Sequence, residues 1–275
     1  MSKQQWRRKF AMMATAIATA ILSHASTAEA TTVLYVPQDD RPVSLAYTVA
    51  TAQDAGYTVL TPPQYYISGR NFQGNADAIW KWVDENASKA DVFVLSTDSL
   101  IYGGLVDSRK HNLELHTLEY RVRHIEELHK QYPNIPMYAF GTVMRSPRAS
   151  GGGVEPSYYD TYGPTIFRIA ALQDKLDSQK LTDDEQKELF TLQATVPVEF
   201  LQDWFHRRQK NMQINRELID ITKKGVFQYF ALGHDDTSSL SQSAMEGRYL
   251  QKYSKGLSPK QYGSFPGADQ LGLLL

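Results

Sequence analysis

The 275-residue sequence contains no cysteine. Disulfide bonds, thiolate metal sites and cysteine nucleophiles are therefore excluded, and packing and polar contacts must stabilise the fold. Positive and negative charges nearly cancel, with a formal net charge of −1 and 21% charged residues. This composition offers no excess of basic residues for binding a phosphate backbone, so we expect no nucleic-acid partner.

Several signatures of particular chemistries are also missing. No pair of histidines stands within a zinc motif, so we predict neither a metal site nor a cofactor. The run Gly151–Gly153 lacks the lysine and the helix that complete a phosphate-binding loop. The G-x-S-x-G turn of serine hydrolases is absent as well.

The N-terminus has the three parts of a signal peptide. A basic stretch at Trp6–Lys9 precedes an apolar stretch at Ala11–Leu22, and Ala28–Ala30 offers a small-x-small cleavage site. We therefore predict that residues 1–30 are a signal peptide and that residues 31–275 form the mature α/β domain. The pair Arg7-Arg8 also fits twin-arginine export, so Sec and twin-arginine routes both remain open. We expect a periplasmic or extracellular protein with no stable membrane anchor after cleavage.

Apolar strand-like runs alternate with amphipathic helical segments along the mature chain. A run without polar alternation is typical of strands buried on both faces, as in parallel sheets. The pattern predicts an α/β fold with a predominantly parallel sheet, either an incomplete (βα)-barrel or a doubly wound sheet. The predicted strands are Thr32–Val36, Tyr57–Leu60, Asp91–Ser96, Ile135–Phe140 and Val226–Leu232. The predicted helices are Leu45–Ala55, Ala76–Ala90, Leu115–Tyr132 and most of Ile166–Lys224, with a capping box at Thr182 and Glu185.

Polar residues follow the predicted strands and the last extended segment. Parallel strands deliver their carboxyl ends to one edge of the sheet, where α/β proteins bind ligands. We therefore expect these side chains to meet in one cleft, although each aspartate also has a simpler interpretation as a helix or turn cap. The candidates are Asp39, Asp40, Arg41, Asp98, Tyr102, Arg145, His234, Asp235, Asp236 and Asp269.

Four sequence blocks resemble the bacterial family called domain of unknown function 4127. They are Val36–Val43 (VPQDDRPV), Ser99–Arg109 (SLIYGGLVDSR), Leu232–Asp236 (LGHDD) and Phe265–Leu273 (FPGADQLGL). Members of that family are usually much longer, so the resemblance implies that this chain is the N-terminal part of a longer protein, truncated at its C-terminus. It also implies an acidic residue after Asp269, where this chain has Gln270. The family name carries no activity.

The carboxylates at the strand ends favour a carbohydrate-active hydrolase. Glycoside hydrolysis needs one protonated and one charged or polarising carboxyl group, and adjacent like charges raise one pKa. We therefore predict Asp235 and Asp236 as the catalytic pair. The other candidates would hold a small-molecule or carbohydrate ligand. The alternatives are a non-catalytic periplasmic binding protein, which needs only hydrogen-bonding groups and aromatic rings, and an inactive truncated fragment.

Overall fold

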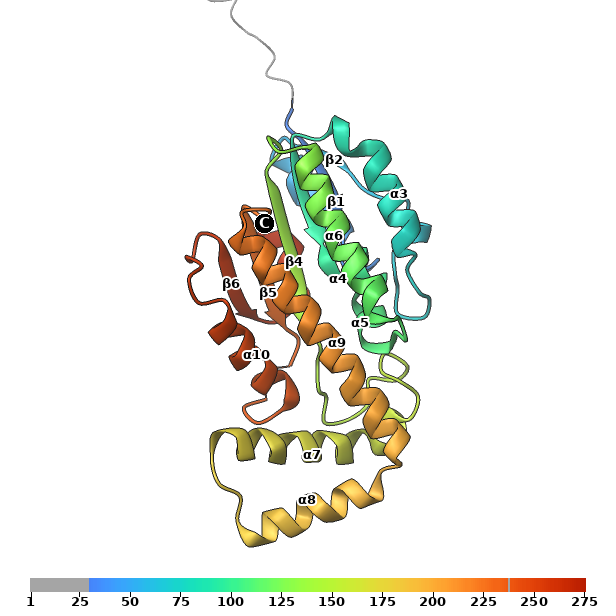
Figure 1. Cartoon of the computed structure of the whole chain (residues 1–275). Coiled ribbons are helices and arrows are strands. Elements are labelled where there is room, and N and C mark those ends of the chain that lie inside the picture. Colours follow the sequence, from blue (N-terminus) through green and yellow to red (C-terminus); the bar gives the residue numbers. More distant parts are fainter. Residues whose placement is uncertain (1–29, 237) are drawn as a thin grey trace, which may run out of the picture. The chain divides into compact units, whose positions relative to one another are not determined.

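The computed structural model describes residues 30–236 and 238–275, so the predicted signal peptide lies almost entirely outside the described residues. The chain forms a six-stranded sheet in the order β2-β1-β3-β4-β5-β6, in which every neighbouring pair is parallel. The sheet is open, and helices flank it (Figure 1). This confirms the predicted α/β fold with a parallel sheet. The strands are β1 Thr32–Val36, β2 Thr58–Leu60, β3 Val92–Ser96, β4 Met137–Val143, β5 Tyr229–His234 and β6 Tyr262–Pro266.

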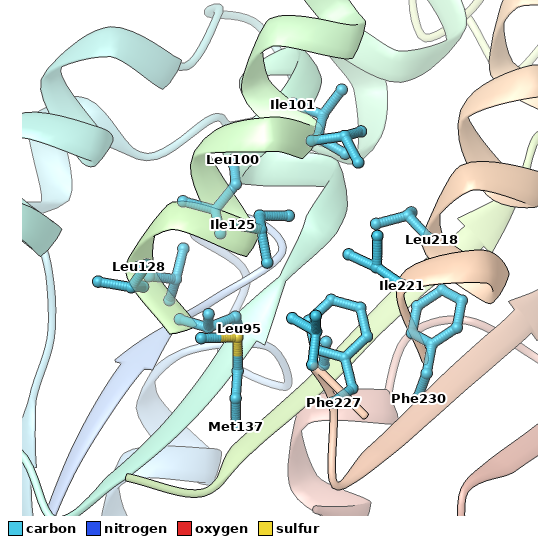
Figure 2. Packing of buried hydrophobic residues seen from close by; sticks show 14 of the residues in the cluster. Leu95, Leu100, Ile101, Ile125, Leu128, Met137, Leu218, Ile221, Phe227 and Phe230 are labelled. Atoms are coloured by element: carbon cyan, nitrogen blue, oxygen red, sulfur yellow. The ribbon is translucent and has the colours of Figure 1, made fainter. Parts of the chain in front are cut away.

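Helices α3, α6, α9 and α10 pack against one face of the sheet and close the larger core. Figure 2 shows its centre, where Ile125 and Leu128 of α6 lie near Leu95 of β3, and Leu218 and Ile221 of α9 lie near Phe227 and Phe230. All of these side chains are buried. The helices present apolar residues at three- and four-residue spacing toward the sheet, and this spacing predicted α3 and α6 correctly. Their bounds are α3 Ala76–Asn86, α6 Leu115–Gln131, α9 Val198–Lys223 and α10 Gln242–Tyr253.

The opposite face of the sheet is covered by two shorter helices. These are α2, Ala46–Asp54, and α11, Leu271–Leu274. Leu271 is buried among Tyr35, Val94 and Phe140 of the inner strands. The segment after β6 therefore returns across the sheet to the first strand of the chain.

A helical excursion separates β4 from β5. It contains α7, Tyr159–Ser178, and α8, Asp183–Thr195, before the long α9 returns to the sheet. The predicted capping box at the start of α8 is confirmed. The backbone N–H of Glu185 donates to Thr182 Oγ1 at 3.2 Å, and the N–H of Thr182 donates to the Glu185 carboxylate at 2.9 Å.

Two short helices after β3 were not predicted. The sequence pattern predicted no helix between Ser96 and Leu115, whereas the chain forms α4, Thr97–Tyr102, and then α5, Leu105–Lys110. Gly103 separates the two helices with a φ of 108°, which a residue with a side chain rarely adopts. Ser96 caps α4 by accepting a hydrogen bond from the N–H of Ser99. Neither helix spans two full turns, so neither shows a readable apolar period.

Strand boundaries also differ from the predicted ones. The fifth strand begins at Tyr229 rather than Val226, because Gly225 ends α9 and the apolar residues Val226 and Phe227 pack into the core before pairing starts. Two single-turn 3₁₀ helices complete the elements, at Gln64–Tyr66 and Ala87–Lys89. Within residues 30–236 and 238–275, no helix has the length and apolar character needed to cross a membrane.

Candidate functional site

A cavity of about 260 Å³ opens where the carboxyl ends of the strands converge. It lies across β1 and β3, between which the strand order reverses direction, and such a switch point is where open α/β sheets bind ligands. Guanidinium and carboxylate groups alternate around its wall. The charged lining residues are Asp39, Arg41, Arg70, Arg109, Arg145, Asp235 and Asp269.

The structure brings half of the predicted site residues into this cavity. These are Asp39 and Arg41 after β1, Arg145 after β4, Asp235 after β5 and Asp269 after β6. Parallel pairing puts all of these strand ends on one edge of the sheet, which is the geometric basis of the expectation. The expected convergence therefore holds for these five residues.

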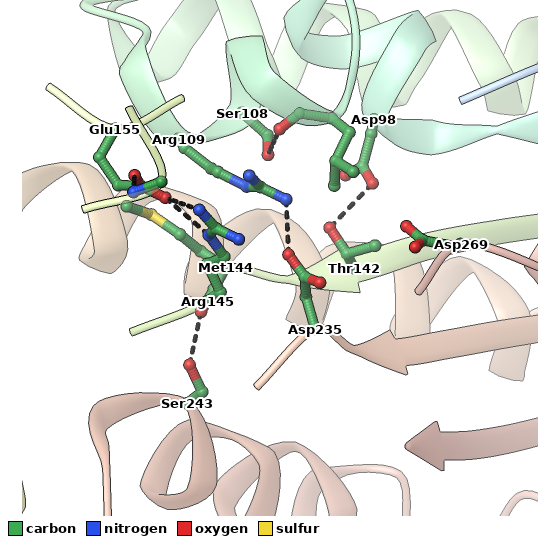
Figure 3. A network of polar contacts seen from close by, with 12 residues as sticks. Asp98, Ser108, Arg109, Thr142, Met144, Arg145, Glu155, Asp235, Ser243 and Asp269 are labelled. Atoms are coloured by element: carbon green, nitrogen blue, oxygen red, sulfur yellow. Dashed lines mark hydrogen bonds and ion pairs between the residues drawn. The ribbon is translucent and has the colours of Figure 1, made fainter. Parts of the chain in front are cut away.

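Ion pairs hold the wall of the cavity together (Figure 3). Arg41 contacts Asp39 at 2.7 Å and Asp269 at 2.8 Å. It thereby joins the segment after β1 to the segment after β6, although three strands lie between them in the sheet. Arg145 donates from Nε to Glu155 at 2.6 Å. Ion pairs therefore fix the orientation of most charged groups in the cavity wall, and Arg70 is the exception within the described residues.

Arg109 and Asp235 form the deepest of these pairs. Arg109 Nη2 lies 2.5 Å from Asp235 Oδ2, and their side chains are only 5% and 18% exposed. Burial lowers the pKa of Arg109, although the neighbouring Asp235 acts in the opposite direction. The pair spans from α5 to the end of β5, so the cavity depends on two segments far apart in the sequence.

Asp98 stands in the first turn of α4 and does not line the cavity. The residue is 2% exposed, and its carboxyl group accepts a hydrogen bond from Thr142 Oγ1 at 2.9 Å. Burial raises the pKa of Asp98 to about 7, against the lowering effects of the Thr142 hydrogen bond and of the Arg109 charge. Asp235 adds a further raising effect through its like charge. Asp98 is thus held near the boundary between its protonated and ionised forms at neutral pH.

Asp40 and Asp236 sit at the edge of the sheet but do not line the cavity. Asp236 accepts a hydrogen bond from the N–H of Ser238 at 2.9 Å. Its other oxygen is buried and has no hydrogen-bond partner among residues 30–236 and 238–275. Burial and the neighbouring Asp39 raise the pKa of Asp40.

Tyr102 and His234 also lie away from the cavity wall. Tyr102 belongs to the larger core, where it stacks on His111 with ring centroids 5.0 Å apart. Burial raises its pKa well above the ordinary value. His234 Nε2 lies 2.7 Å from Ser264 Oγ, and its ring covers Gly247 so closely that a Cβ there would clash. Burial lowers the pKa of His234.

Sequence reasoning missed three charged residues of the site. Arg109 belongs to the SLIYGGLVDSR block, but it stands on the unpredicted helix α5 rather than directly after a strand. Arg70 comes from the loop before α3, and Glu155 comes from the loop between β4 and α7. The block itself was the available signal for Arg109. No spacing in the sequence pointed to Glu155. Its side chain is 1% exposed, and its role in the site is the ion pair with Arg145.

The described part of the chain contains no group of three or more histidine, aspartate or glutamate side chains arranged to hold a metal ion. In the cavity, guanidinium groups occupy the positions between the carboxylates. The cavity wall can therefore supply hydrogen-bond donors from its guanidinium groups and acceptors from its carboxylates.

The fold and this site define an α/β protein with an open parallel sheet and a charged pocket at its carboxyl edge. The chain belongs to the family described as protein of unknown function DUF4127, whose model matches residues 33–275. This confirms the resemblance read from the four sequence blocks. No curated protein matches the sequence.

Proposed function

We propose that this protein is a carbohydrate-active hydrolase that works in the periplasm or outside the cell. Alternating guanidinium and carboxylate groups in the cavity support a polyhydroxyl ligand, because each sugar hydroxyl can donate to a carboxylate and accept from an arginine. The signal-peptide pattern of residues 1–30 supports export.

One observation carries the hydrolase proposal. Asp98 and Asp235 both interact with Arg109, yet their environments differ sharply. Burial raises the pKa of Asp98 to about 7, whereas Asp235 is engaged in an ion pair with Arg109. Glycoside hydrolysis uses two carboxyl groups of this kind, one as an acid and one as a carboxylate.

In this mechanism Asp98 gives its proton to the glycosidic oxygen as the bond to the anomeric carbon breaks. Asp235 either attacks that carbon or takes a proton from the attacking water. Arg109 fixes the orientation of Asp235 and limits repulsion between the two carboxyl groups. This assignment keeps Asp235 from the sequence-based pair and puts Asp98 in place of Asp236, whose Oδ1 accepts from the backbone of Ser238.

The second candidate is ligand binding without turnover. It is favoured by the 2% exposure of Asp98, because a general acid must come within hydrogen-bond reach of the substrate. In that case the cavity would bind a sugar through Asp39, Arg41, Asp235 and Asp269, while Asp98 would only support Thr142.

Turnover of a panel of aryl glycosides by the full chain separates these candidates. For a hydrolase, Asp98→Asn and Asp235→Asn should each lower kcat by about 10²–10⁴-fold, the range expected for loss of a general acid or base. Asp236→Asn is the matched control and should change kcat little. The rate of the unsubstituted protein should fall as the pH rises through about 7, because Asp98 then loses its proton.

Two outcomes would contradict the hydrolase assignment. If Asp98→Asn and Asp235→Asn both retain activity, other groups perform the reaction. If no glycoside is hydrolysed but sugar binding is measurable by calorimetry and lost in Asp235→Asn, the binding candidate replaces the hydrolase.

A further inference from the structure

A second cavity of about 290 Å³ adjoins the first and shares Arg70 and Val106 with it. We call this second cavity the distal pocket. Its remaining lining includes Asn71, Phe72 and Lys110. Each cavity alone is slightly below the usual range of roughly 300–1,000 Å³ for small-molecule sites, whereas the two together lie within it. A ligand that extends through both would match a chain of sugar units better than a single one.

The charges of the two cavities are balanced differently. In the first cavity Arg41, Arg109 and Arg145 are each held by a carboxylate. By contrast, Arg70 and Lys110 form no ion pair within residues 30–236 and 238–275. Arg70 Nη2 donates to the carbonyl of Gly151 at 3.0 Å, and Lys110 Nζ donates to that of Gly153 at 2.8 Å.

Both cations keep donors for a ligand. A guanidinium group has five N–H donors and an ammonium group has three. The hydrogen bonds of Arg70 within the described residues come from Nη2 alone, and Lys110 makes a single one. Asp107, the carboxylate of the distal wall, is 6% exposed and accepts a hydrogen bond from the N–H of Gly74 at 3.0 Å. Within the described residues it forms no ion pair with Arg70 or Lys110, so it does not occupy their donors.

The distal pocket also offers contacts suited to a sugar ring. The Phe72 side chain is 50% exposed at its wall, which leaves a ring face for stacking against C–H groups of a sugar. Asn71 and Gln73 add amide donors and acceptors beside it. Cationic, amide and aromatic groups thus meet in one small volume.

We infer that the ligand is an acidic oligosaccharide whose ring carboxylate binds between Arg70 and Lys110 in the distal pocket. The neighbouring unit then occupies the first cavity. This inference rests on the proposed carbohydrate function and adds the substrate class. Charge-assisted hydrogen bonds to the carboxylate supply the selectivity, because a neutral sugar leaves both cations with carbonyl partners alone.

Calorimetric titration with matched ligands tests the inference. Trimers of galacturonic, glucuronic and mannuronic acid are each compared with their methyl esters, which keep the rings and remove the charge. At least one acid should bind about tenfold more tightly than its ester, because hydrogen bonds to a charged carboxylate are stronger than those to a neutral ester. Arg70→Gln and Lys110→Gln should each weaken binding of that acid by about tenfold and leave binding of the ester unchanged.

Two variants serve as controls. Arg70→Lys retains a positive charge and should keep part of the preference for the acid. Lys187→Gln removes an exposed positive charge on α8, where the side chain is 80% exposed, and should change nothing. Since a fold defect would weaken acid and ester alike, the acid-to-ester ratio reports the role of the cations rather than stability.

The outcome also separates this inference from the proposed function. If every acid binds no better than its ester, or no trimer binds at all, the acidic-ligand assignment is wrong. If neutral aryl glycosides are hydrolysed without any preference for uronates, only this assignment fails. If uronate trimers bind selectively but no glycoside is cleaved, the acidic-ligand assignment is supported and the hydrolase proposal is wrong.

Discussion

Replacing Asp98 with asparagine tests the electrostatics at the centre of the site without requiring a substrate. Asparagine has the same shape and can still accept the hydrogen bond from Thr142, but it cannot ionise. Burial raises the pKa of Asp98 from 3.8 to about 7 in the folded protein. In the unfolded chain this carboxyl group returns to its ordinary pKa.

The direction of the pH dependence follows from this difference. Between about pH 4 and pH 7 the folded protein keeps a proton on Asp98 that the unfolded chain releases. Asp98 therefore supports stability most fully below its unfolded pKa, and that support is lost as the pH rises through about 7. Each pH unit corresponds to about 1.4 kcal/mol, so the whole interval amounts to about 4 kcal/mol. Typical domains unfold at a total cost of roughly 5–15 kcal/mol, so this change is large enough to measure.

Urea denaturation of the unsubstituted protein and of Asp98→Asn, across this pH range, gives the assay. The difference between their free energies of unfolding cancels the other titrating groups. Asp98→Asn should gain stability relative to the unsubstituted protein by about 1.4 kcal/mol per pH unit up to about pH 7, and the difference should then level off. The exposed Asp54→Asn is the control. If the free energies of unfolding of Asp98→Asn and of the unsubstituted protein change in parallel with pH, the raised pKa of Asp98 is refuted.

Three further predictions concern other parts of the molecule. Arg208→Met should lower the free energy of unfolding by about 3–5 kcal/mol in urea denaturation, because it leaves the buried Glu246 carboxylate, 2.7 Å from Arg208, without its cation. Adding Glu246→Leu should recover part of this loss. A cost below about 1 kcal/mol for Arg208→Met would contradict this account of the pair. Thr182→Ala should lower the free energy of unfolding by about 1 kcal/mol, because it removes the capping box of α8. Thr191→Ala, inside the same helix, should lower it less, and equal losses would rule out a capping effect. Mass spectrometry of the exported protein should find an N-terminus at Thr31, and an intact Met1 would disprove cleavage after Ala30.

The local pattern of the sequence was sufficient to predict the regular strands of the sheet. The runs at Thr32–Val36 and Asp91–Ser96 are apolar without alternation, and both became buried parallel strands. The capping box at Thr182 was equally readable, because all of its contacts lie within four residues. By contrast, α4 and α5 were not predicted, because a helix of six residues is too short to show an apolar period in the sequence.

The residues of the candidate site also fall into those that the local sequence predicted and those that only packing brought together. Strands that alternate with helices along the chain pair in parallel, so the sequence by itself indicated that polar residues after β1, β4, β5 and β6 would reach one edge of the sheet. It also determined the family, through four blocks of adjacent residues.

Only the tertiary structure decided which charges meet. Arg109 pairs with Asp235 across 126 positions, and Arg41 meets Asp269 although β1 and β6 are not neighbours in the sheet. The same packing buried Tyr102 in the core and raised the pKa of Asp98. These outcomes depend on distance and burial in space, which are set by how helices and loops pack over the strand ends and not by any spacing along the chain.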